Sequence, residues 1–163
     1  MIRDARADDG EEIARIQHRS WQVGYAHIFP AEQLAAPHID PERWRARLVE
    51  PPPGWRTFVA DDRAVRVAGF ACTGPNRDDA TIGELYALYV DPDAWGDGIG
   101  RELIAHAEEA LRPYGEATLW VLEDNPRARR FYEAAGWTLD EGVAKTDTFL
   151  ETEVVEVRYR KRF

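Results

Sequence analysis

The feature that most constrains the fold of this chain is a junction at residues 84–111, where an apolar strand pattern passes through a loop into an amphipathic helix. The strand pattern ends at Val90, and the loop carries Gly96, Gly98 and Gly100. Glycine has no Cβ and readily adopts positive φ angles, so the main chain of such a loop can turn tightly and expose its N–H groups. At the start of a helix these groups and the helix dipole favour an anion. The junction therefore predicts a phosphate-binding loop.

The spacing of the glycines discriminates between phosphate ligands. A dinucleotide-binding loop needs G-x-G-x-x-G, but the chain has G-x-G-x-G, with Arg101 where the third glycine would stand. A Walker loop needs Gly-Lys-Ser or Gly-Lys-Thr, and neither occurs in the sequence. The ligand that remains is the pyrophosphate of an acyl-CoA.

Three segments resemble the GNAT superfamily of acetyl-CoA-dependent N-acetyltransferases. They are ELYALYVDP at 84–92, WGDGIG at 95–100 and NPRARRFYEAAGW at 125–137, in the order that the family has. The family's loop begins with Gln or Arg, which Trp95 replaces here, while the glycines are kept. The resemblance implies the acyl-CoA N-acyltransferase fold, an α/β (α+β) architecture in which helices flank a mixed, largely antiparallel central sheet of about six to seven strands.

The length and the periodicity of the chain are consistent with a single domain over 1–163, because no linker or repeat divides it. Apolar residues at helical spacing predict four helices, and alternating or continuous apolar runs predict strands, the last of which form a closing hairpin. The predicted helices are 9–26, with Asp8 or Asp9 as its cap, 41–50, 98–111 and 126–135; the predicted strands are 2–5, 55–60, 64–73, 81–90, 117–122, 137–150 and 154–159.

Composition excludes several classes of function. Cys72 is the only cysteine and the four histidines are scattered, so we expect no disulfide and no metal site. The N-terminus lacks an apolar leader and no apolar run approaches the roughly 20 residues of a membrane span, so we expect a cytoplasmic protein with no membrane partner. The net charge of −9 argues against a nucleic-acid partner and favours cationic small molecules.

The resemblance implies which residues hold acetyl-CoA. The backbone of Leu88, Tyr89 and Val90 would bond to the pantetheine arm like an added strand, with the N–H of Leu88 as the expected donor to the thioester oxygen. Asn125 would cap the following helix, contact the pantetheine arm, or do both. The phosphates would lie against the loop and nearby arginines, each of which could instead be a solvated side chain: Trp95, Gly96, Asp97, Gly98, Ile99, Gly100, Arg101, Arg129 and Arg130.

The same resemblance assigns one catalytic group, and the residues themselves indicate a second. Tyr132 occupies the family's tyrosine position and would protonate the leaving thiolate, because a phenol with a pKa of about 10 is close to a thiol; the alternative is a core aromatic. Glu84 would be the general base for the amine, since a carboxylate that opens an apolar strand is costly unless it is used or paired. The alternative for Glu84 is a solvent-exposed strand end.

The acceptor site is expected on a variable wall from the first helices. Aromatic residues in SWQVGYAHIF would contribute to it, together with Glu84 and Tyr86 of the strand before the loop. The aromatic residues could equally belong to the core or to a dimer contact. They are Trp21, Tyr25, His27 and Phe29.

The predicted function is transfer of an acetyl group from acetyl-CoA to a primary amine of a small molecule, by direct attack in a ternary complex. Two alternatives stay open: transfer to an amine of a protein or peptide, and a regulatory module that binds acyl-CoA without catalysis. Cys72 lies in an apolar strand with no histidine near it in sequence, so we expect a buried structural thiol. The closing strand ETEVVEVRYRK could pair with its copy in a second chain, which would give a homodimer.

Overall fold

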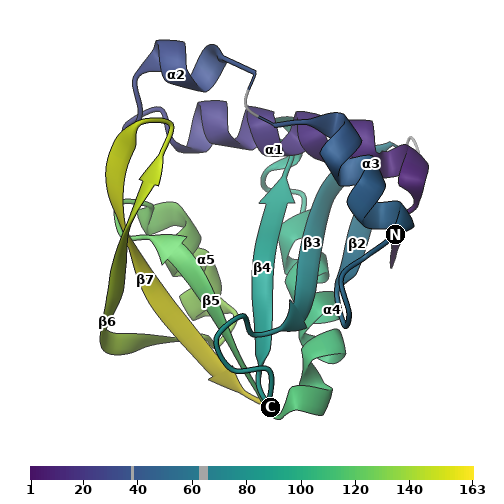
Figure 1. Ribbon diagram of the computed structural model, residues 1–163, viewed down its shortest axis with the longest axis vertical. Helices are drawn as coiled ribbons and strands as arrows, with labels where there is room; N and C mark the ends of the chain where they lie inside the picture. Colours follow the sequence, from purple (N-terminus) through teal and green to yellow (C-terminus); the bar gives the residue numbers. More distant parts are fainter. Residues whose placement is uncertain (38, 63–65) are drawn as a thin grey trace.

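The chain folds into one mixed seven-stranded sheet with helices on both faces (Figure 1). The computed structural model describes residues 1–37, 39–62 and 66–163. The strand order is β1-β2-β3-β4-β5-β7-β6, and every neighbouring pair is antiparallel except β4 with β5. The predicted architecture, a largely antiparallel sheet flanked by helices, is confirmed.

The predicted elements are present, and the short helix α2 is an addition. Residues 63–65, where the predicted 64–73 strand begins, lie outside the described residues. The strands are β1 (Ile2–Asp4), β2 (Arg56–Asp61), β3 (Val67–Pro75), β4 (Gly83–Val90), β5 (Glu116–Leu122), β6 (Thr138–Phe149) and β7 (Thr152–Arg162); the helices are α1 (Gly10–Gly24), α2 (Ala31–Ala35), α3 (Pro41–Val49), α4 (Ile99–Leu111) and α5 (Pro126–Ala134).

The start of α1 differs from the prediction. Asp9 makes no side-chain cap for α1, which follows a turn of 3-10 helix at Ala7–Asp9. The Asp9 carboxylate accepts a hydrogen bond from the Arg6 N–H at 2.6 Å and pairs with Arg3 at 2.7 Å. It therefore ties the chain before the helix to β1 instead of capping the helix itself.

The parallel strands β4 and β5 separate after a short contact and enclose a V-shaped gap (Figure 1). They pair only at Gly83 with Ala117 and at Glu84 with Thr118. On the other side of β4 the Asp91 N–H donates to the Ala68 carbonyl at 2.8 Å, which continues the ladder with β3. Because main-chain groups alternate sides along an antiparallel strand, the N–H groups of Leu88 and Val90 point away from β3 and into the gap.

Two apolar clusters cover the two faces of the sheet, with α4 and α5 on one face and α1 and α3 on the other. A register shift between Cys72 and Thr73 leaves an extra residue in β4. As a result Leu85 and Leu88 pack into the cluster beneath α4, whereas Tyr86, Ala87 and Tyr89 pack into the cluster beneath α1 and α3. The face of β4 that carries Tyr86 and Tyr89 is thus the face covered by α1.

The prediction that the closing strand is free to pair with a second chain is wrong. Strand β7 lies inside the sheet, with β5 on one side and β6 on the other. Its hydrogen-bonding groups are used within the chain, because the long partner strand β6 takes the edge position. Among the helices of the described residues, none has the length and apolarity needed to cross a bilayer.

Candidate active site

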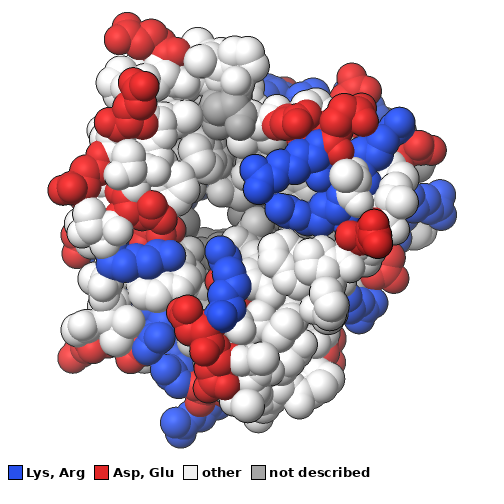
Figure 2. All heavy atoms as spheres, viewed as in Figure 1, with Lys and Arg blue, Asp and Glu red and all other residues white. Residues whose placement is uncertain are grey.

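A cavity of about 740 Å³ occupies the gap between β4 and β5 and extends to α1, α5 and the β6–β7 hairpin. Figure 2 shows the corresponding hollow near the middle of this face of the molecule, with basic side chains along its rim. Most of the predicted site residues line the cavity: Trp21, Tyr25, Phe29, Glu84, Tyr86, Leu88, Tyr89, Val90, Trp95, Gly96, Gly98, Ile99, Gly100, Arg101, Asn125 and Tyr132. The chain thus brings together residues that lie more than a hundred positions apart in sequence.

The glycine loop has the conformation that the sequence requires. Gly96 and Gly98 adopt φ angles of +98° and +86°, and Gly98 is the N-cap of α4. A Cβ at either position would meet no atom, so the need for glycine is conformational and not steric. The free N–H groups of the first turn of α4 therefore face the cavity as a cradle for an anion.

Trp95 anchors the loop where the family pattern has a polar side chain. Its indole Nε1 donates to the Val90 carbonyl at 2.8 Å, which ties the loop to the end of β4. Arg127 from α5 lies over the face of the Trp95 ring, with Cζ 3.3 Å from the ring centroid. Arg127 lines the cavity, and burial lowers the pKa of its guanidinium. This pair joins the loop after β4 to the helix after β5.

Arg129 and Arg130, the two arginines of α5 that were predicted to contact the phosphates, lie away from the cavity that Arg127 lines. The Arg129 side chain donates to the Tyr159 hydroxyl at 3.1 Å and to the Glu123 carbonyl at 3.3 Å, and neither Arg129 nor Arg130 lines the cavity. Sequence reasoning missed Arg127. A signal for it exists, because Arg127 precedes Phe131 by four positions and residues at that spacing share a helix face.

The N-terminus of α5 positions Asn125 at the cavity. Its Oδ1 accepts a hydrogen bond from the Ala128 N–H at 3.1 Å, so the predicted capping role is confirmed. Asn125 also lines the cavity. The contact between Asn125 and a pantetheine arm stays a prediction.

Tyr132 is both a core aromatic and a cavity residue. It is 8 % exposed, and its ring contacts those of Phe131 and Trp137 at centroid distances of 5.3 and 6.5 Å. Within the described ranges its hydroxyl has no hydrogen-bond partner, although the residue lines the cavity. Burial, with a smaller contribution from Tyr89, raises the pKa of Tyr132 far above its usual value. The phenol therefore holds its proton at neutral pH.

Glu84 is buried, with 2 % of its surface exposed, so the alternative of a solvent-exposed strand end is wrong. Its carboxylate accepts hydrogen bonds from the Arg77 main-chain N–H at 3.1 Å and from the Arg77 Nη2 at 2.8 Å. Arg77 also lies over the Tyr86 ring at 5.0 Å. The Tyr86 hydroxyl donates to the Pro75 carbonyl, and burial beside Glu84 raises the pKa of Tyr86 to about 12.

An aromatic group from α1 and β4 forms the far wall of the cavity. The Tyr89 hydroxyl accepts a hydrogen bond from the Trp21 indole at 3.0 Å, and the Tyr25 side chain lies beside that hydroxyl. Burial raises the pKa of both tyrosines. Trp21 packs further against Phe149 of β6 at 5.8 Å between ring centroids. His27 lies elsewhere, with Nε2 2.6 Å from the Asp124 carbonyl oxygen.

A second carboxylate, Glu156 of β7, lines the same cavity and was missed by sequence reasoning. It pairs with Lys145 of β6 at 3.1 Å, and the Lys145 ammonium lies 4.5 Å from the centroid of the Trp120 ring. Glu156 precedes the buried Val157 in β7, so the sequence predicts that the two side chains point to opposite faces of the sheet. Which other strands and helices lie beside Glu156 depends on the order of the strands in the sheet. The sequence gives no direct signal for that order.

Other catalytic chemistries find no support in the described part of the chain. There, no cluster of His, Cys, Asp and Glu is disposed to hold a metal ion. Cys72 is buried, and burial raises the pKa of its thiol to about 11, so it is present as the unreactive thiol. What the cavity does combine is an anion cradle, an open strand edge, a protonated phenol and a buried carboxylate.

Comparison with known proteins gives these features a context. A sequence profile described as the Acetyltransferase (GNAT) family matches residues 11–137. The chain is 33 % identical over 139 residues to a protein of Bacillus subtilis (strain 168) named uncharacterized N-acetyltransferase YuaI, and the match covers 82 % of this chain and 77 % of that protein.

More distant similarities point the same way. A mycothiol acetyltransferase of Beutenbergia cavernae is 47 % identical over 62 residues, which is 37 % of this chain and only 21 % of that longer protein. The crystal structure of the PaiA N-acetyltransferase from Thermoplasma acidophilum in complex with coenzyme A superposes with a TM-score of 0.78 at 21 % identity, covering 100 % of this chain and 98 % of the other. At that identity the superposition establishes the fold alone.

Proposed function

Because the chain belongs to the GNAT family of acetyltransferases, we propose that it transfers an acetyl group from acetyl-CoA to a primary amine of a small molecule. The amine attacks the thioester directly in a ternary complex, so no acetyl-enzyme is formed. Acetyl-CoA is a cosubstrate, and no metal takes part.

The observation that carries this proposal is the open edge of β4. The N–H groups of Leu88 and Val90 point into the gap where β5 has diverged, so an amide chain can add to this edge as a further strand would. The pantetheine arm of CoA is such a chain. The edge leads directly into the glycine loop, where the first turn of α4 can hold the pyrophosphate beside Arg101 and Arg127.

Transfer forms a C–N bond and breaks a C–S bond, while the nitrogen loses two protons and the sulfur gains one. An alkyl ammonium has a pKa of about 10 and must lose a proton before it attacks, and Glu84 accepts that proton directly or through water. The main-chain N–H of Leu88 donates to the thioester oxygen as negative charge develops on it. Tyr132, which burial keeps protonated, gives its proton to the departing thiolate, and the second proton of the attacking nitrogen then restores the Tyr132 hydroxyl.

A small-molecule acceptor is supported by the lining of the site and by one relative. The acceptor side is lined by the aromatic residues Trp21, Tyr25 and Tyr89, against which a small apolar group can pack. A mycothiol acetyltransferase, which is similar to this chain over 62 residues, is named for a small thiol-bearing molecule. Transfer to a protein amine is the alternative that the acceptor screen below would reveal.

The test is calorimetric titration with acetyl-CoA, followed on the same sample by measurement of thiol release with a panel of small amines and basic peptides. We expect acetyl-CoA to bind with a constant between about 1 μM and 1 mM and thiol release to require an amine. Glu84→Gln should bind acetyl-CoA equally well and lower amine-dependent turnover about 100-fold or more. Glu109→Gln, which removes an exposed carboxylate, is the matched control.

The outcomes separate the candidate functions. Release with peptides alone would move the acceptor to the protein class. Binding without release from any amine would favour a non-catalytic acyl-CoA-binding module, and absence of binding would overturn the cradle.

A further inference from the structure

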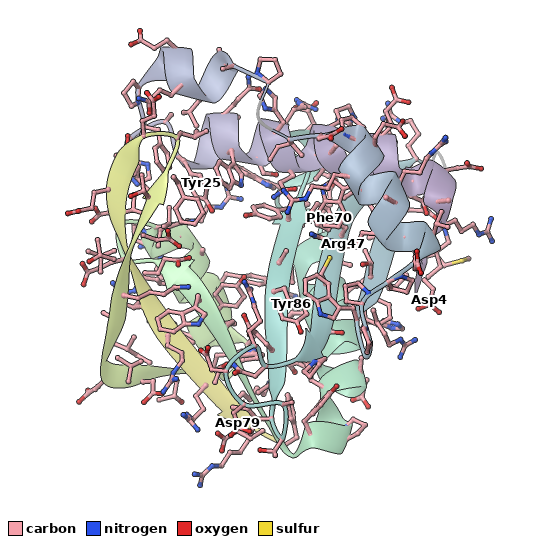
Figure 3. All side chains as sticks on the ribbon, in the orientation of Figure 1. Asp4, Tyr25, Arg47, Phe70, Asp79 and Tyr86 are labelled. Carbon is pink, nitrogen blue, oxygen red and sulfur yellow. The ribbon has the colours of Figure 1, made fainter. Side chains whose placement is uncertain are left out.

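One half-buried arginine, Arg47, has no counter-ion among the described residues. Arg47 reaches from α3 toward the sheet on the side of Tyr86 (Figure 3). Its Cζ lies 5.2 Å from the ring centroid of Trp44 and 5.1 Å from that of Trp55. Both indoles hold the guanidinium through ring contacts, which use none of its N–H donors.

The two indoles connect Arg47 to the cavity wall. The Trp44 Nε1 donates to the Gln17 Oε1 at 3.0 Å, and the Trp55 ring stacks on Tyr86 at a centroid distance of 4.0 Å. Gln17 and Tyr86 both line the cavity. Arg47 is not itself a lining residue; it stands directly behind the wall formed by α1 and β4, on the face of the sheet opposite α4 and α5, and one layer of rings separates it from the cavity.

Arg47 differs from comparable arginines in its lack of partners. Among the described residues, Arg47 is the one half-buried arginine whose guanidinium makes neither an ion pair nor a hydrogen bond. Shortage of acids is not the reason, because the chain has 30 acidic against 21 basic side chains. The nearby carboxylate of Glu84 is already bonded by Arg77. The other half-buried arginines have acidic or hydroxyl partners: Arg3, Arg15, Arg19, Arg129, Arg158 and Arg160.

Two unpaired guanidiniums that do line the cavity lie where an anion is expected. Arg101 and Arg127 line the cofactor end without an ion pair among the described residues, beside the anion cradle of the glycine loop. Arg47 is likewise unpaired, but it lies behind the wall of α1 and β4, on the face of the sheet opposite α4. A planar guanidinium with free in-plane donors suits a carboxylate or a phosphate, which it can bind through paired hydrogen bonds.

We propose that Arg47 binds an acidic group of the acceptor, so the small molecule that receives the acetyl group carries a carboxylate or a phosphate in addition to its amine. This inference rests on the proposed acetyltransferase function. It narrows the acceptor class from amines in general to anionic amines. Arg47 is then a specificity-determining residue that holds the acceptor while Glu84 and Tyr132 move the protons.

The test is steady-state thiol release at saturating acetyl-CoA with primary amines that differ in one group. Phenylalanine, its carboxamide and phenethylamine form the carboxylate series, and 2-aminoethyl phosphate with 2-aminoethanol forms the phosphate series; a wider amine library includes equal numbers of acidic and neutral members. We expect the accepted members to be acidic. Arg47→Gln should raise the KM for them about 10- to 100-fold, since hydrogen bonds to charged groups are lost, and change kcat little.

Two variants control the experiment. Arg43→Gln removes an exposed charge from the same helix and should leave KM unchanged, and Arg47→Lys should recover part of the affinity. The affinity of each variant for acetyl-CoA and its thermal midpoint should match those of the unmodified protein. Preference for neutral amines, or an equal change in KM for acidic and neutral amines with Arg47→Gln, would overturn the inference. If acetyl-CoA binds but no amine of either kind releases thiol, the proposed function itself fails.

Discussion

The cofactor side and the acceptor side of the cavity are built from different parts of the chain. On the proposed cofactor side, the cavity is lined by β4, the glycine loop and the start of α4, which follow one another within 84–111. On the acceptor side, the surface consists of side chains from α1, β4, β6 and β7, which are brought together only by packing. The first side depends on backbone conformation, and the second depends on the order of the strands in the sheet.

This difference explains how each side can vary. A site made of N–H groups tolerates changes of side chain as long as the glycines remain, as Trp95 at the start of the loop illustrates. A site made of side chains changes its ligand whenever one of them changes. We therefore expect the cofactor to be common to proteins with this loop, while under the proposal above the acceptor would depend on side chains such as Arg47.

Tyr132 lies on the cofactor side, and we propose that it acts in the reaction. Its substitution therefore tests whether turnover and cofactor affinity change separately. Tyr132→Phe removes only the hydroxyl, which has no partner among the described residues. We expect kcat to fall about 10²- to 10⁴-fold because a positioned general acid is lost, with the affinity for acetyl-CoA unchanged within about 2-fold. Stopped-flow thiol release and calorimetry measure the two quantities. Unchanged turnover would leave Tyr132 as a packing residue.

Asp91 joins the two sides, because it ends β4 just before the loop and binds two arginines of α1. It is 5 % exposed and accepts hydrogen bonds from Arg15 at 2.6 Å and from Arg19 at 2.7 Å. Burial alone would raise the pKa of Asp91, but these arginines and the Asp93 N–H hold it below the usual value. Asp91→Asn should therefore lower the free energy of unfolding by about 1–3 kcal/mol at pH 7.

The pH dependence of this effect has a definite sign. A carboxylate whose folded-state pKa is depressed stabilises the fold above its unfolded pKa of about 3.9, and the stabilisation disappears as the pH falls through the folded-state value. Urea unfolding of Asp91→Asn should thus approach that of the unmodified protein in acid. Asp93→Asn, at a 79 % exposed side chain, is the control and should have little effect at either pH. Equal destabilisation at both pH values would contradict the role of the charge.

Gly98 tests whether the cofactor side depends on backbone conformation. Gly98→Ala adds a methyl group in open space but must hold a φ of +86°, which costs about 1–2 kcal/mol. We expect acetyl-CoA to bind about 5- to 30-fold more weakly, with the KM of the acceptor unchanged. Gly142→Ala, at a φ of +76° in β6 and also in open space, should destabilise the fold similarly without weakening the cofactor. Equal loss of affinity in both variants would contradict a local effect.

The smallest effect is expected at Trp95. Trp95→Phe keeps a ring face for Arg127 but removes the N–H that bonds the Val90 carbonyl. Loss of one such bond is worth about 0.5–1.5 kcal/mol, so acetyl-CoA affinity should fall about 2- to 10-fold. Calorimetry measures it. A decrease as large as that of Gly98→Ala would show that side chains matter on the cofactor side as much as backbone does.

The sequence predicts the cofactor side better than the acceptor side for the same reason. The strand, loop and helix at 84–111 are contiguous, so their glycines and apolar pattern indicate a cradle without knowledge of the rest of the fold. Glu156 and Arg47 could not be predicted. The position of Glu156 at the cavity depends on β7 lying between β5 and β6, and the position of Arg47 behind the cavity wall depends on α3 packing over the sheet. The order of the strands is also missing from the sequence, which is why β7 was predicted to be able to pair with a second chain.

Amide hydrogen exchange by NMR, with and without acetyl-CoA, tests the central claim that the cosubstrate lies along the open edge of β4. Binding should slow exchange at Leu88 and Val90, whose N–H groups point into the gap, and in the first turn of α4. Tyr89, whose N–H points toward β3, should change much less. Saturating acetyl-CoA that leaves Leu88, Val90 and the loop amides unprotected would contradict the account.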